Sequence, residues 1–283
     1  MTILNDLREE YIHTNGINLH TIISGSGKAL VLLHGFPDFW YGWKNLIPEL
    51  QKDFQLIIPD LRGYNTSDKP EGIQNYKIEI LIEDVRGICE ALKLDKIYLA
   101  GHDWGGIISW VLAERYPELV EKLIILNAPH PVIFQKTMKE DIQQKKASVY
   151  VMQFQKEGGE IFLFENDFFA LKFSVFENTK NRKAFSKADK EKYKSAWSQP
   201  NAVKSAVNYY KAFVEPYQGT GKIDVPTLVI WGMKDDYLKP VQLEYLPEYV
   251  KKLKIVKSEK SSHWIMYDDP ELVIMNIKEF LKK

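Results

Sequence analysis

Apolar and polar residues alternate over residues 10–23 (EYIHTNGINLHTII), on both sides of the pair Asn15-Gly16. A repeat of two residues is typical of a strand with one buried face. Asn-Gly accepts the positive φ angles of a type I′ turn, which suits the twist of two paired strands. The segment is therefore predicted to form a β-hairpin.

Further along the chain, short continuous apolar runs are typical of strands buried on both faces. They are 29–33 (ALVLL), 54–59 (FQLIIP), 96–100 (KIYLA), 122–126 (KLIIL), 227–231 (TLVIW) and 254–256 (KIV). Helical periodicity is clearest in 77–92, and helices are also expected at about 105–116 and from about Pro270. Strands that alternate with helices predict an α/β fold, with a mostly parallel central sheet and helices on both faces.

Residues 131–220 break this alternation, because they contain no clear strand run and have helical stretches rich in Lys, Phe and Tyr. We therefore expect an all-helical insertion that forms a lid between two strands of the sheet. The predicted organisation is a core in two parts, residues 1–130 and 221–283, with the lid at 131–220.

Composition sharpens the contrast between the insertion and the core. The insertion holds 16 of the 36 aromatic residues and 10 of the 14 phenylalanines. It has 15 Lys and Arg against 10 Asp and Glu, although the whole chain has 38 of each. A neutral chain argues against general nucleic-acid binding, which requires a basic surface.

Cysteine usage and hydropathy bear on the expected compartment. Cys89 is the single cysteine, so no internal disulfide is possible, which fits a reducing compartment. The first residues, MTILNDLREEY, lack the apolar region of a signal peptide. No apolar run approaches the roughly 20 residues that span a bilayer. We expect a soluble, cytoplasmic protein without a membrane partner, as a monomer or a homodimer.

Candidate chemistry begins at residues 101–106 (GHDWGG), which follow a predicted buried strand and open a predicted helix. This is the context of the nucleophile elbow, where Gly-x-Ser-x-Gly holds a serine on a sharp turn. The glycines remove Cβ clashes that such a turn causes. Here Asp103 occupies the position of the nucleophile, and its alternative role is that of a helix N-cap.

An aspartate nucleophile indicates a reaction class. Attack by serine on an alkyl carbon would leave an ether, which water does not readily cleave. Attack by the carboxylate of Asp103 leaves an ester, which water hydrolyses at the original carboxyl carbon. The residue therefore suits displacement at an sp³ carbon, as in an epoxide or an alkyl halide, and suits ester or amide cleavage poorly.

The expected partners of Asp103 follow in the order nucleophile, acid, histidine that the α/β-hydrolase fold uses. Asp235 and Asp236 follow the strand run 227–231, and His263 follows the last strand run. His263 would activate water and the acid would orient its imidazole. Asp235 is favoured as the acid on its spacing from the strand, which leaves Asp236 as a loop charge.

A second loop would supply the oxyanion hole. Residues 34–37 (HGFP) follow the first apolar run, where this fold donates a backbone N–H. Phe36 and Trp104 are the predicted N–H donors, and Pro37 is expected to be cis. His34 and His102 lie in tight glycine turns and are expected to be structural. No set of metal ligands is visible, and no cofactor is expected.

Together these motifs resemble those of the soluble epoxide hydrolases of the α/β-hydrolase fold. The resemblance covers nearly the whole chain and rests on HGFPDFWYGW at 34–43, DLRGYNTSDKP at 60–70, GHDWGG at 101–106, WGMKDDYL at 231–238 and SSHWIMYDDP at 261–270. GHDWGG with HGFP is specific to the branch of epoxide hydrolases and haloalkane dehalogenases. Asn65 departs from the pattern, which has glycine there, but asparagine tolerates the positive φ of such a turn.

The resemblance also implies two lid tyrosines that donate a proton to the epoxide oxygen. Matching the segment YVMQFQ places the first at Tyr150, and matching NYYK places the second at Tyr210 in preference to Tyr209. A tyrosine pKa near 10 allows donation at neutral pH. The alternative is that these side chains only pack in the core of the lid.

These features predict an epoxide hydrolase that converts a small, uncharged, apolar epoxide and water to a vicinal diol. Phe36, Trp104, Tyr150 and Tyr210 would contact the substrate. The alternative enzyme is a haloalkane dehalogenase, with Trp197 as a candidate halide donor. Many such enzymes have Asn where Phe36 stands, and fluoroacetate dehalogenases typically have Arg where Trp104 stands. A non-catalytic ligand receptor on the same fold is the third alternative.

Overall fold

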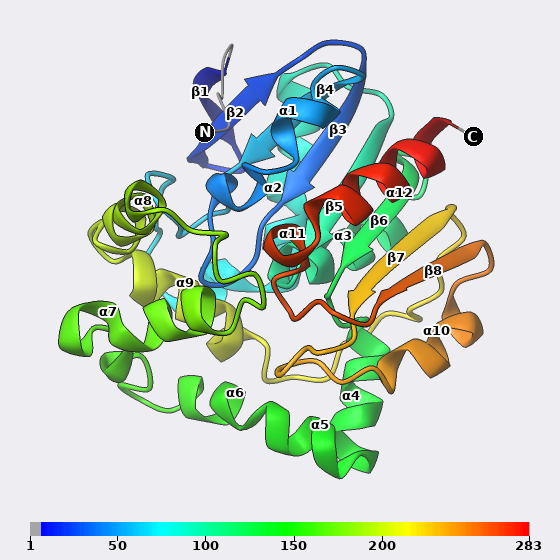
Figure 1. The fold of residues 1–283 in the computed structure, drawn as a ribbon. Helices are drawn as coiled ribbons and strands as arrows, with labels where there is room; N and C mark the ends of the chain where they lie inside the picture. Colours follow the sequence, from blue (N-terminus) through cyan, green and yellow to red (C-terminus); the bar gives the residue numbers. More distant parts are fainter. Residues whose placement is uncertain (1–6, 283) are drawn as a thin grey trace.

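The computed structural model describes residues 7–282, which form an eight-stranded sheet in the order β1-β2-β4-β3-β5-β6-β7-β8 (Figure 1). The strands are β1 (Arg8–Thr14), β2 (Ile17–Ser24), β3 (Lys28–Leu33), β4 (Phe54–Pro59), β5 (Ile97–His102), β6 (Val120–Leu126), β7 (Thr227–Gly232) and β8 (Leu253–Ser258). From β4 to β8 all neighbouring strands are parallel, whereas β2 pairs with both β1 and β4 in the antiparallel sense. The predicted mostly parallel sheet is confirmed.

The predicted hairpin is present at the amino-terminal edge of the sheet. Thr14 pairs with Ile17, which leaves Asn15 and Gly16 as the two-residue turn. Their φ angles are 47° and 76°, the sign that a type I′ turn requires. The sequence pair Asn-Gly therefore fixes the register of both strands.

Helices cover both faces of the sheet, as the alternating pattern predicted. Helices α2 (Ile78–Ala91) and α3 (Trp104–Arg115) lie on one face, and α1 (Ile47–Leu50) and α12 (Pro270–Lys282) lie on the other (Figure 1). Strand β3 shows why, because Val31 and Leu33 pack into one hydrophobic cluster while Leu30 and Leu32 pack into the other. A strand buried on both faces requires a continuous apolar run.

A helical insertion joins β6 to β7. It comprises α4 (Pro131–Glu140), α5 (Ile142–Ala147), α6 (Val149–Phe154), η3 (Ile161–Leu163), α7 (Glu165–Lys172), the π-helix η4 (Phe173–Glu177), α8 (Lys187–Trp197) and α9 (Ala202–Ala212). Figure 1 shows these helices over the carboxyl ends of the strands. The two ends of the insertion meet, since His130 Nε2 lies 2.9 Å from the carbonyl oxygen of Gly221.

Several elements were not predicted, namely η1 (Trp40–Trp43), η2 (Ile73–Tyr76), α1, α10 (Gln242–Tyr249) and α11 (Ile265–Asp268). Helix α10 contains Pro247, a residue that ordinarily argues against a helix interior.

The expectation of no signal peptide concerned the first residues, of which 1–6 lie outside the described part. Among residues 7–282, no helix is long and apolar enough to cross a membrane.

Candidate active site

Asp103 occupies the sharp turn between β5 and α3. Its backbone has φ 50° and ψ −121°, a positive-φ combination that is strained for a residue with a side chain. The turn is possible because Gly105 lies against β3, where an added Cβ would come within 2.2 Å of the Leu33 carbonyl oxygen. The predicted nucleophile elbow therefore has the expected geometry. It places the Asp103 carboxylate beyond the carboxyl end of β5, which is a central strand of the sheet.

The loop after β3 reaches the Asp103 carboxylate, as predicted for an oxyanion hole. The backbone N–H of Phe36 donates to Asp103 Oδ1 at 2.7 Å. This approach requires Gly35, because a Cβ there would lie 2.3 Å from the Cβ of Asp103. The Phe36-Pro37 peptide bond is cis, as expected.

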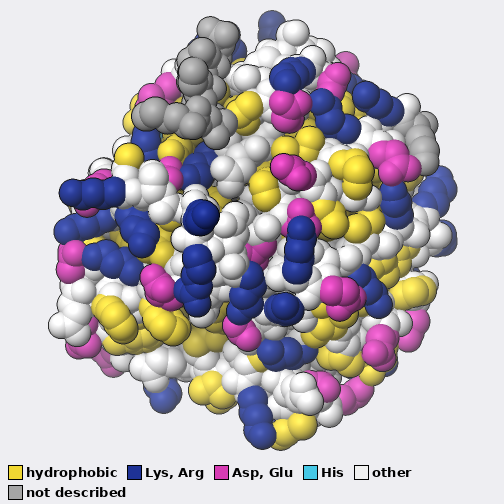
Figure 2. Space-filling model, viewed as in Figure 1, with side chains coloured by type: hydrophobic (Ala, Val, Ile, Leu, Met, Phe, Trp, Pro, Cys, Tyr) yellow, Lys and Arg dark blue, Asp and Glu magenta, His cyan; other side chains and the backbone are white. Residues whose placement is uncertain are grey.

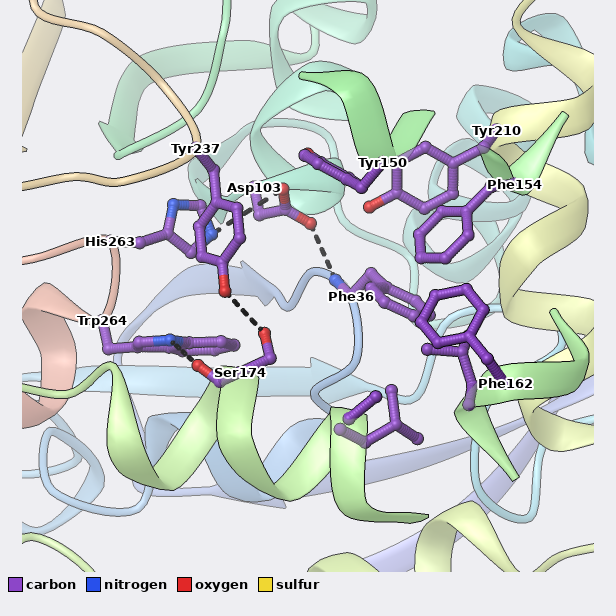
Figure 3. Close-up of a pocket in the computed structure, with 13 residues that line it drawn as sticks. Phe36, Asp103, Tyr150, Phe154, Phe162, Ser174, Tyr210, Tyr237, His263 and Trp264 are labelled. Carbon is purple, nitrogen blue, oxygen red and sulfur yellow. Dashed lines mark hydrogen bonds and ion pairs between the residues drawn. The ribbon is translucent and has the colours of Figure 1, made fainter. Parts of the chain in front are cut away.

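His263 lies between Asp103 and Asp235. Its Nδ1 is 2.8 Å from Asp235 Oδ2, and its Nε2 is 3.8 Å from Asp103 Oδ2. All three side chains are buried. Figure 3 shows His263 and Asp103 facing each other at one end of a cavity. Three positions far apart in the sequence thus meet because parallel strands end at the same edge of the sheet.

The choice between the two candidate acids follows from burial. Asp235 is 3% exposed and accepts hydrogen bonds from the backbone N–H groups of Tyr237 and Leu238 through Oδ1. The Asp236 side chain is 60% exposed and lies 3.6 Å from Lys180. Asp235 is therefore the carboxylate in contact with His263, which favours it as the predicted acid, whereas Asp236 is an exposed loop charge.

Asn127, which sequence reasoning missed, holds Asp235 from the other side. Its amide nitrogen donates to Asp235 Oδ2 at 2.7 Å, and its amide oxygen accepts from the Gly232 N–H at 2.8 Å. Asn127 follows β6 directly, so its place at the carboxyl edge of a strand is the one signal that the sequence contained. It belongs to no motif quoted above.

Burial and charge act in opposite directions on the two reacting groups. Burial raises the pKa of the Asp103 carboxyl, and this outweighs the lowering by His263 and by the N–H groups of Phe36 and Trp104. Burial lowers the pKa of His263, but the carboxylate of Asp235, followed by that of Asp103, raises it above the ordinary value. The charge of each group therefore opposes the effect of burial on the pKa of the other.

His34 and His102 have structural hydrogen bonds, as expected. The Leu61 N–H donates to His34 Nε2 at 3.0 Å, and burial lowers the pKa of His34. His102 Nε2 lies 2.9 Å from the carbonyl oxygen of His263, and burial holds the pKa of His102 well below its usual range. His102 thus stays neutral and supports the backbone of His263.

The two predicted lid tyrosines both reach the cavity. Tyr150 comes from α6 and Tyr210 from α9, and their ring centroids are 5.9 Å apart. Burial raises the pKa of both hydroxyls well above 10, and the charge of Asp103 raises both further. Both groups are therefore protonated donors at neutral pH. Tyr209 instead donates its hydroxyl to the carbonyl of Arg62, which supports the choice of Tyr210.

The cavity beneath these tyrosines is largely apolar. Its lining combines Asp103, His263, Tyr150 and Tyr210 with Phe36, Phe154, Phe162, Leu163, Ala170, Leu171, Ser174, Tyr237 and Trp264 (Figure 3). Sequence reasoning named only the four polar residues and Phe36. Trp104 is not among the lining residues, although its indole packs edge-on against Tyr210 with centroids 5.1 Å apart. The Trp104 side chain therefore supports Tyr210, and its contact with substrate stays a prediction.

Trp197, the candidate halide donor, and Asn65, the departure from the family's motif, both have hydrogen-bond partners within the protein. The Trp197 indole N–H donates to the Pro37 carbonyl at 2.7 Å, so this donor is already used within the protein. Asn65 has φ 42°, and its side chain donates to Asp60 at 2.7 Å. In the described part of the chain, no cluster of three or more potential ligands that could hold a metal ion was found.

Comparison with known proteins agrees with this geometry. The family model described as the alpha/beta hydrolase fold matches residues 28–270. Epoxide hydrolase 4 of Homo sapiens is 36% identical, over 96% of this chain and 78% of its own length. AB hydrolase superfamily protein YfhM of Bacillus subtilis is 37% identical, over 99% of each chain.

A solved structure extends the agreement to three dimensions. The epoxide hydrolase of Bacillus megaterium in complex with an inhibitor has a TM-score of 0.92 and 35% identity, covering 97% of this chain and 100% of that chain. The match therefore includes the helical insertion as well as the sheet. The chain belongs to the α/β-hydrolase fold family, in the group of the epoxide hydrolases.

Proposed function

We propose that the protein hydrolyses small, uncharged, apolar epoxides to vicinal diols through an ester on Asp103. The observation that carries the proposal is the arrangement of Asp103, His263 and Asp235 at one end of a cavity that Tyr150 and Tyr210 also line. The group of enzymes to which the chain belongs supports the same reaction. No step requires a cofactor or metal.

In the first step, Asp103 Oδ2 attacks a carbon of the oxirane. This oxygen is the free one, because Oδ1 accepts the hydrogen bond from the Phe36 N–H. The carbon–oxygen bond of the ring breaks, and the leaving alkoxide takes a proton from Tyr150 or Tyr210. Since burial and the Asp103 charge keep both hydroxyls protonated, they donate only when the more basic alkoxide forms.

In the second step, water attacks the carboxyl carbon of the Asp103 ester. His263 accepts the proton of this water, and Asp235 stabilises the resulting imidazolium through its bond to Nδ1. The tetrahedral oxyanion forms on Oδ1, which already faces the Phe36 N–H. Trp104 is the second predicted donor, and its backbone N–H already acts on the Asp103 carboxyl. Collapse releases the diol and restores the carboxylate.

The helical insertion completes the site in this proposal. We divide the chain into a core of residues 1–130 and 221–283 and a lid of residues 131–220. The lid supplies Tyr150, Tyr210 and most of the apolar wall. A largely apolar cavity limits the access of bulk water and suits an uncharged substrate. The buried single cysteine, Cys89, supports a cytoplasmic location as part of the same proposal.

A single turnover in ¹⁸O-water tests the ester. With enzyme in excess over styrene oxide, ¹⁸O should enter the Asp103 carboxyl, and the first diol should carry oxygen from Asp103. Mass spectrometry of the peptide that contains Asp103 gives the answer. Label in the first diol, with none in Asp103, would overturn the ester mechanism. Asp103→Asn, confirmed by mass, should lose steady-state diol formation.

The neighbouring aspartates provide a matched pair for the role of the acid. Asp235→Asn should lower kcat by at least about a hundredfold, since it removes the charge that stabilises the His263 imidazolium. Asp236→Asn removes the same charge from an exposed position and should change kcat by less than about threefold. Equal losses would contradict the assignment. Halide release from alkyl bromides without diol from styrene oxide would favour the dehalogenase instead.

A further inference from the structure

A chain of polar side chains reaches the cavity at a place that the proposed reaction does not use. The Asn178 amide donates to the Tyr237 hydroxyl at 2.6 Å, and the Tyr237 and Ser174 hydroxyls are 3.0 Å apart. Figure 3 shows the Tyr237 hydroxyl directed away from Asp103 and toward Ser174. Ser174 and Tyr237 both line the cavity.

Counting hydrogen-bond donors shows that this chain is incomplete. The two hydroxyls carry two protons, and the bond between Tyr237 and Ser174 uses one of them. Asn178 brings its own proton, so Tyr237 accepts there. The remaining hydroxyl proton has no acceptor among residues 7–282, whichever of the two groups carries it. One O–H donor is thus left at the cavity wall.

The backbone around Ser174 holds this donor in place. Ser174 lies in the π-helix η4, a rare helix type that is frequent at functional sites. Its carbonyl oxygen accepts from the Trp264 indole N–H at 2.7 Å. Because Trp264 directly follows His263, this bond fixes the Ser174 position relative to the catalytic end of the cavity.

The surroundings define the chemistry of the missing partner. The partner must accept a hydrogen bond, and the walls around the donor are largely apolar, so once a substrate displaces water from the cavity the acceptor must come from the bound molecule. Asp103 lies in the same cavity and Asp235 lies behind His263, so an anionic acceptor is repelled. A neutral oxygen, such as that of an ether or carbonyl group, satisfies both conditions.

We propose that Ser174 and Tyr237 form a second polar subsite, which donates a hydrogen bond to a neutral acceptor oxygen in the side chain of the epoxide. The preferred substrates are then epoxides with an ether or carbonyl oxygen beyond the ring, rather than pure hydrocarbons. This inference rests on the proposed epoxide hydrolysis in the same cavity. Ser174 acts here as a specificity residue, away from the reacting atoms.

Two pairs of substrates test the subsite. Phenyl glycidyl ether is paired with 4-phenyl-1,2-epoxybutane, and 4-phenoxy-1,2-epoxybutane with 5-phenyl-1,2-epoxypentane, so that each pair differs by one oxygen in place of a methylene. For at least one pair, either Ser174→Ala or Tyr237→Phe, according to which hydroxyl is the free donor, should lower the ratio of kcat/KM, ether over carbon analogue, by about three- to tenfold, as expected for one neutral hydrogen bond. The change should lie mainly in KM.

Two further variants separate recognition from structural damage. Ser174→Thr keeps a hydroxyl and should restore most of the ratio, whereas Ser198→Ala removes an exposed lid hydroxyl and should leave it unchanged. Diol formation from all four epoxides with unchanged ratios in both Ser174→Ala and Tyr237→Phe would overturn the subsite and leave the proposed function intact. Absence of diol from every epoxide with wild-type enzyme would overturn the proposed function, and the subsite with it.

Discussion

Asp103, the proposed nucleophile, is also one of the charges that set the protonation of His263. Burial lowers the pKa of His263, and Asp235 and then Asp103 raise it. Ester formation turns the Asp103 carboxylate into a neutral group, so one of the raising charges disappears. The pKa of His263 therefore falls in the intermediate, where the neutral imidazole is the form that activates water.

The variant Asp103→Asn imitates this loss of charge. The pKa of His263, followed by NMR titration of the ring protons, should be lower in Asp103→Asn than in the wild type. An equal or higher pKa in the variant would contradict the assigned coupling. Asp224→Asn, which neutralises an exposed carboxylate paired with Lys251, is the control and should leave the titration unchanged.

Asp38 is a buried carboxyl outside the reacting groups. Burial raises its pKa to about 7, although the Tyr193 hydroxyl and the Phe39 N–H both donate to Oδ1 and lower it. Within the described chain Oδ2 has no hydrogen-bond partner. The charges that act on it are those of Asp60, which raises its pKa, and Lys44, which lowers it. Folding therefore favours the protonated form of Asp38.

This preference makes folding stability depend on pH. The unfolded carboxyl has a pKa near 3.8, so between pH 5 and 7 the folded state holds a proton that the unfolded state has lost. Raising the pH across this range should cost about 2 kcal/mol of the free energy of unfolding from Asp38 alone. Asp38→Asn should remove that part of the decline, as measured by urea denaturation at several pH values. Parallel pH profiles for both proteins would contradict the prediction.

At the scale of elements, α8 is attached to the core through a buried ion pair. Lys44 follows η1, and its Nζ lies 2.7 Å from Asp189 Oδ1 in the first turn of α8, with both side chains about one-tenth exposed. The Tyr41 hydroxyl donates to the same oxygen at 2.8 Å. The pKa of Asp189 is lowered to about 2, because these donors and Ser186 outweigh the effect of burial.

Removal of one member of this pair leaves a buried charge without its partner. Lys44→Met should therefore lower the free energy of unfolding by about 3 kcal/mol. Lys251→Met breaks the pair with Asp224, whose side chains are 77% and 66% exposed, and should cost less than about 0.5 kcal/mol. Chemical denaturation measures both. Equal losses would show that burial does not decide the strength of the attachment.

The elements also show how far the sequence pattern determines the fold. All six apolar runs that were predicted as strands correspond to strands of the sheet, because a strand covered on both faces needs apolar residues on both. Helix α10 was not predicted, because it contains Pro247 and its apolar residues follow the helical repeat only weakly. Its packing against α4 supports the helix in the folded protein. The helices of the insertion were predicted as a class but without boundaries, since their apolar residues serve both the lid interior and the cavity.

The candidate site divides in the same way. Asp103, His263, Asp235 and Phe36 belong to motifs that the sequence displays, so the sequence was sufficient to predict that these residues lie together. Asn127, Ser174 and Tyr237 act through single contacts to residues distant in the sequence. No local pattern encodes such contacts, so they required the structure.

On the scale of the whole molecule, equal numbers of acidic and basic residues conceal a local charge. Figure 2 shows Lys and Arg side chains gathered on the side of the molecule where α8 lies in Figure 1. Four exposed lysines in or next to α8 make no ion pair within residues 7–282, namely Lys183, Lys187, Lys190 and Lys192. Charges within a Debye length of about 10 Å act together, so this surface is locally positive.

Ion-exchange chromatography tests this distribution. A variant with Lys183, Lys187, Lys190 and Lys192 replaced by Gln should elute from a cation exchanger at lower salt than a control variant of the same net charge. The control replaces four exposed lysines elsewhere, namely Lys96, Lys234, Lys252 and Lys257. Identical elution would mean that net charge alone governs adsorption and that the cluster has no local effect.

The hydrogen bond between His130 and Gly221 joins the two ends of the helical insertion at a single point beside α3 and α10. The chain thus leaves β6 and returns to β7 through one narrow neck, while the two strands stay paired. Loop-closure entropy grows only slowly with the length of chain beyond such a neck. A change in the length of the insertion therefore need not disturb the pairing of β6 with β7, the two strands that lead to Asn127 and to the loop of the proposed acid.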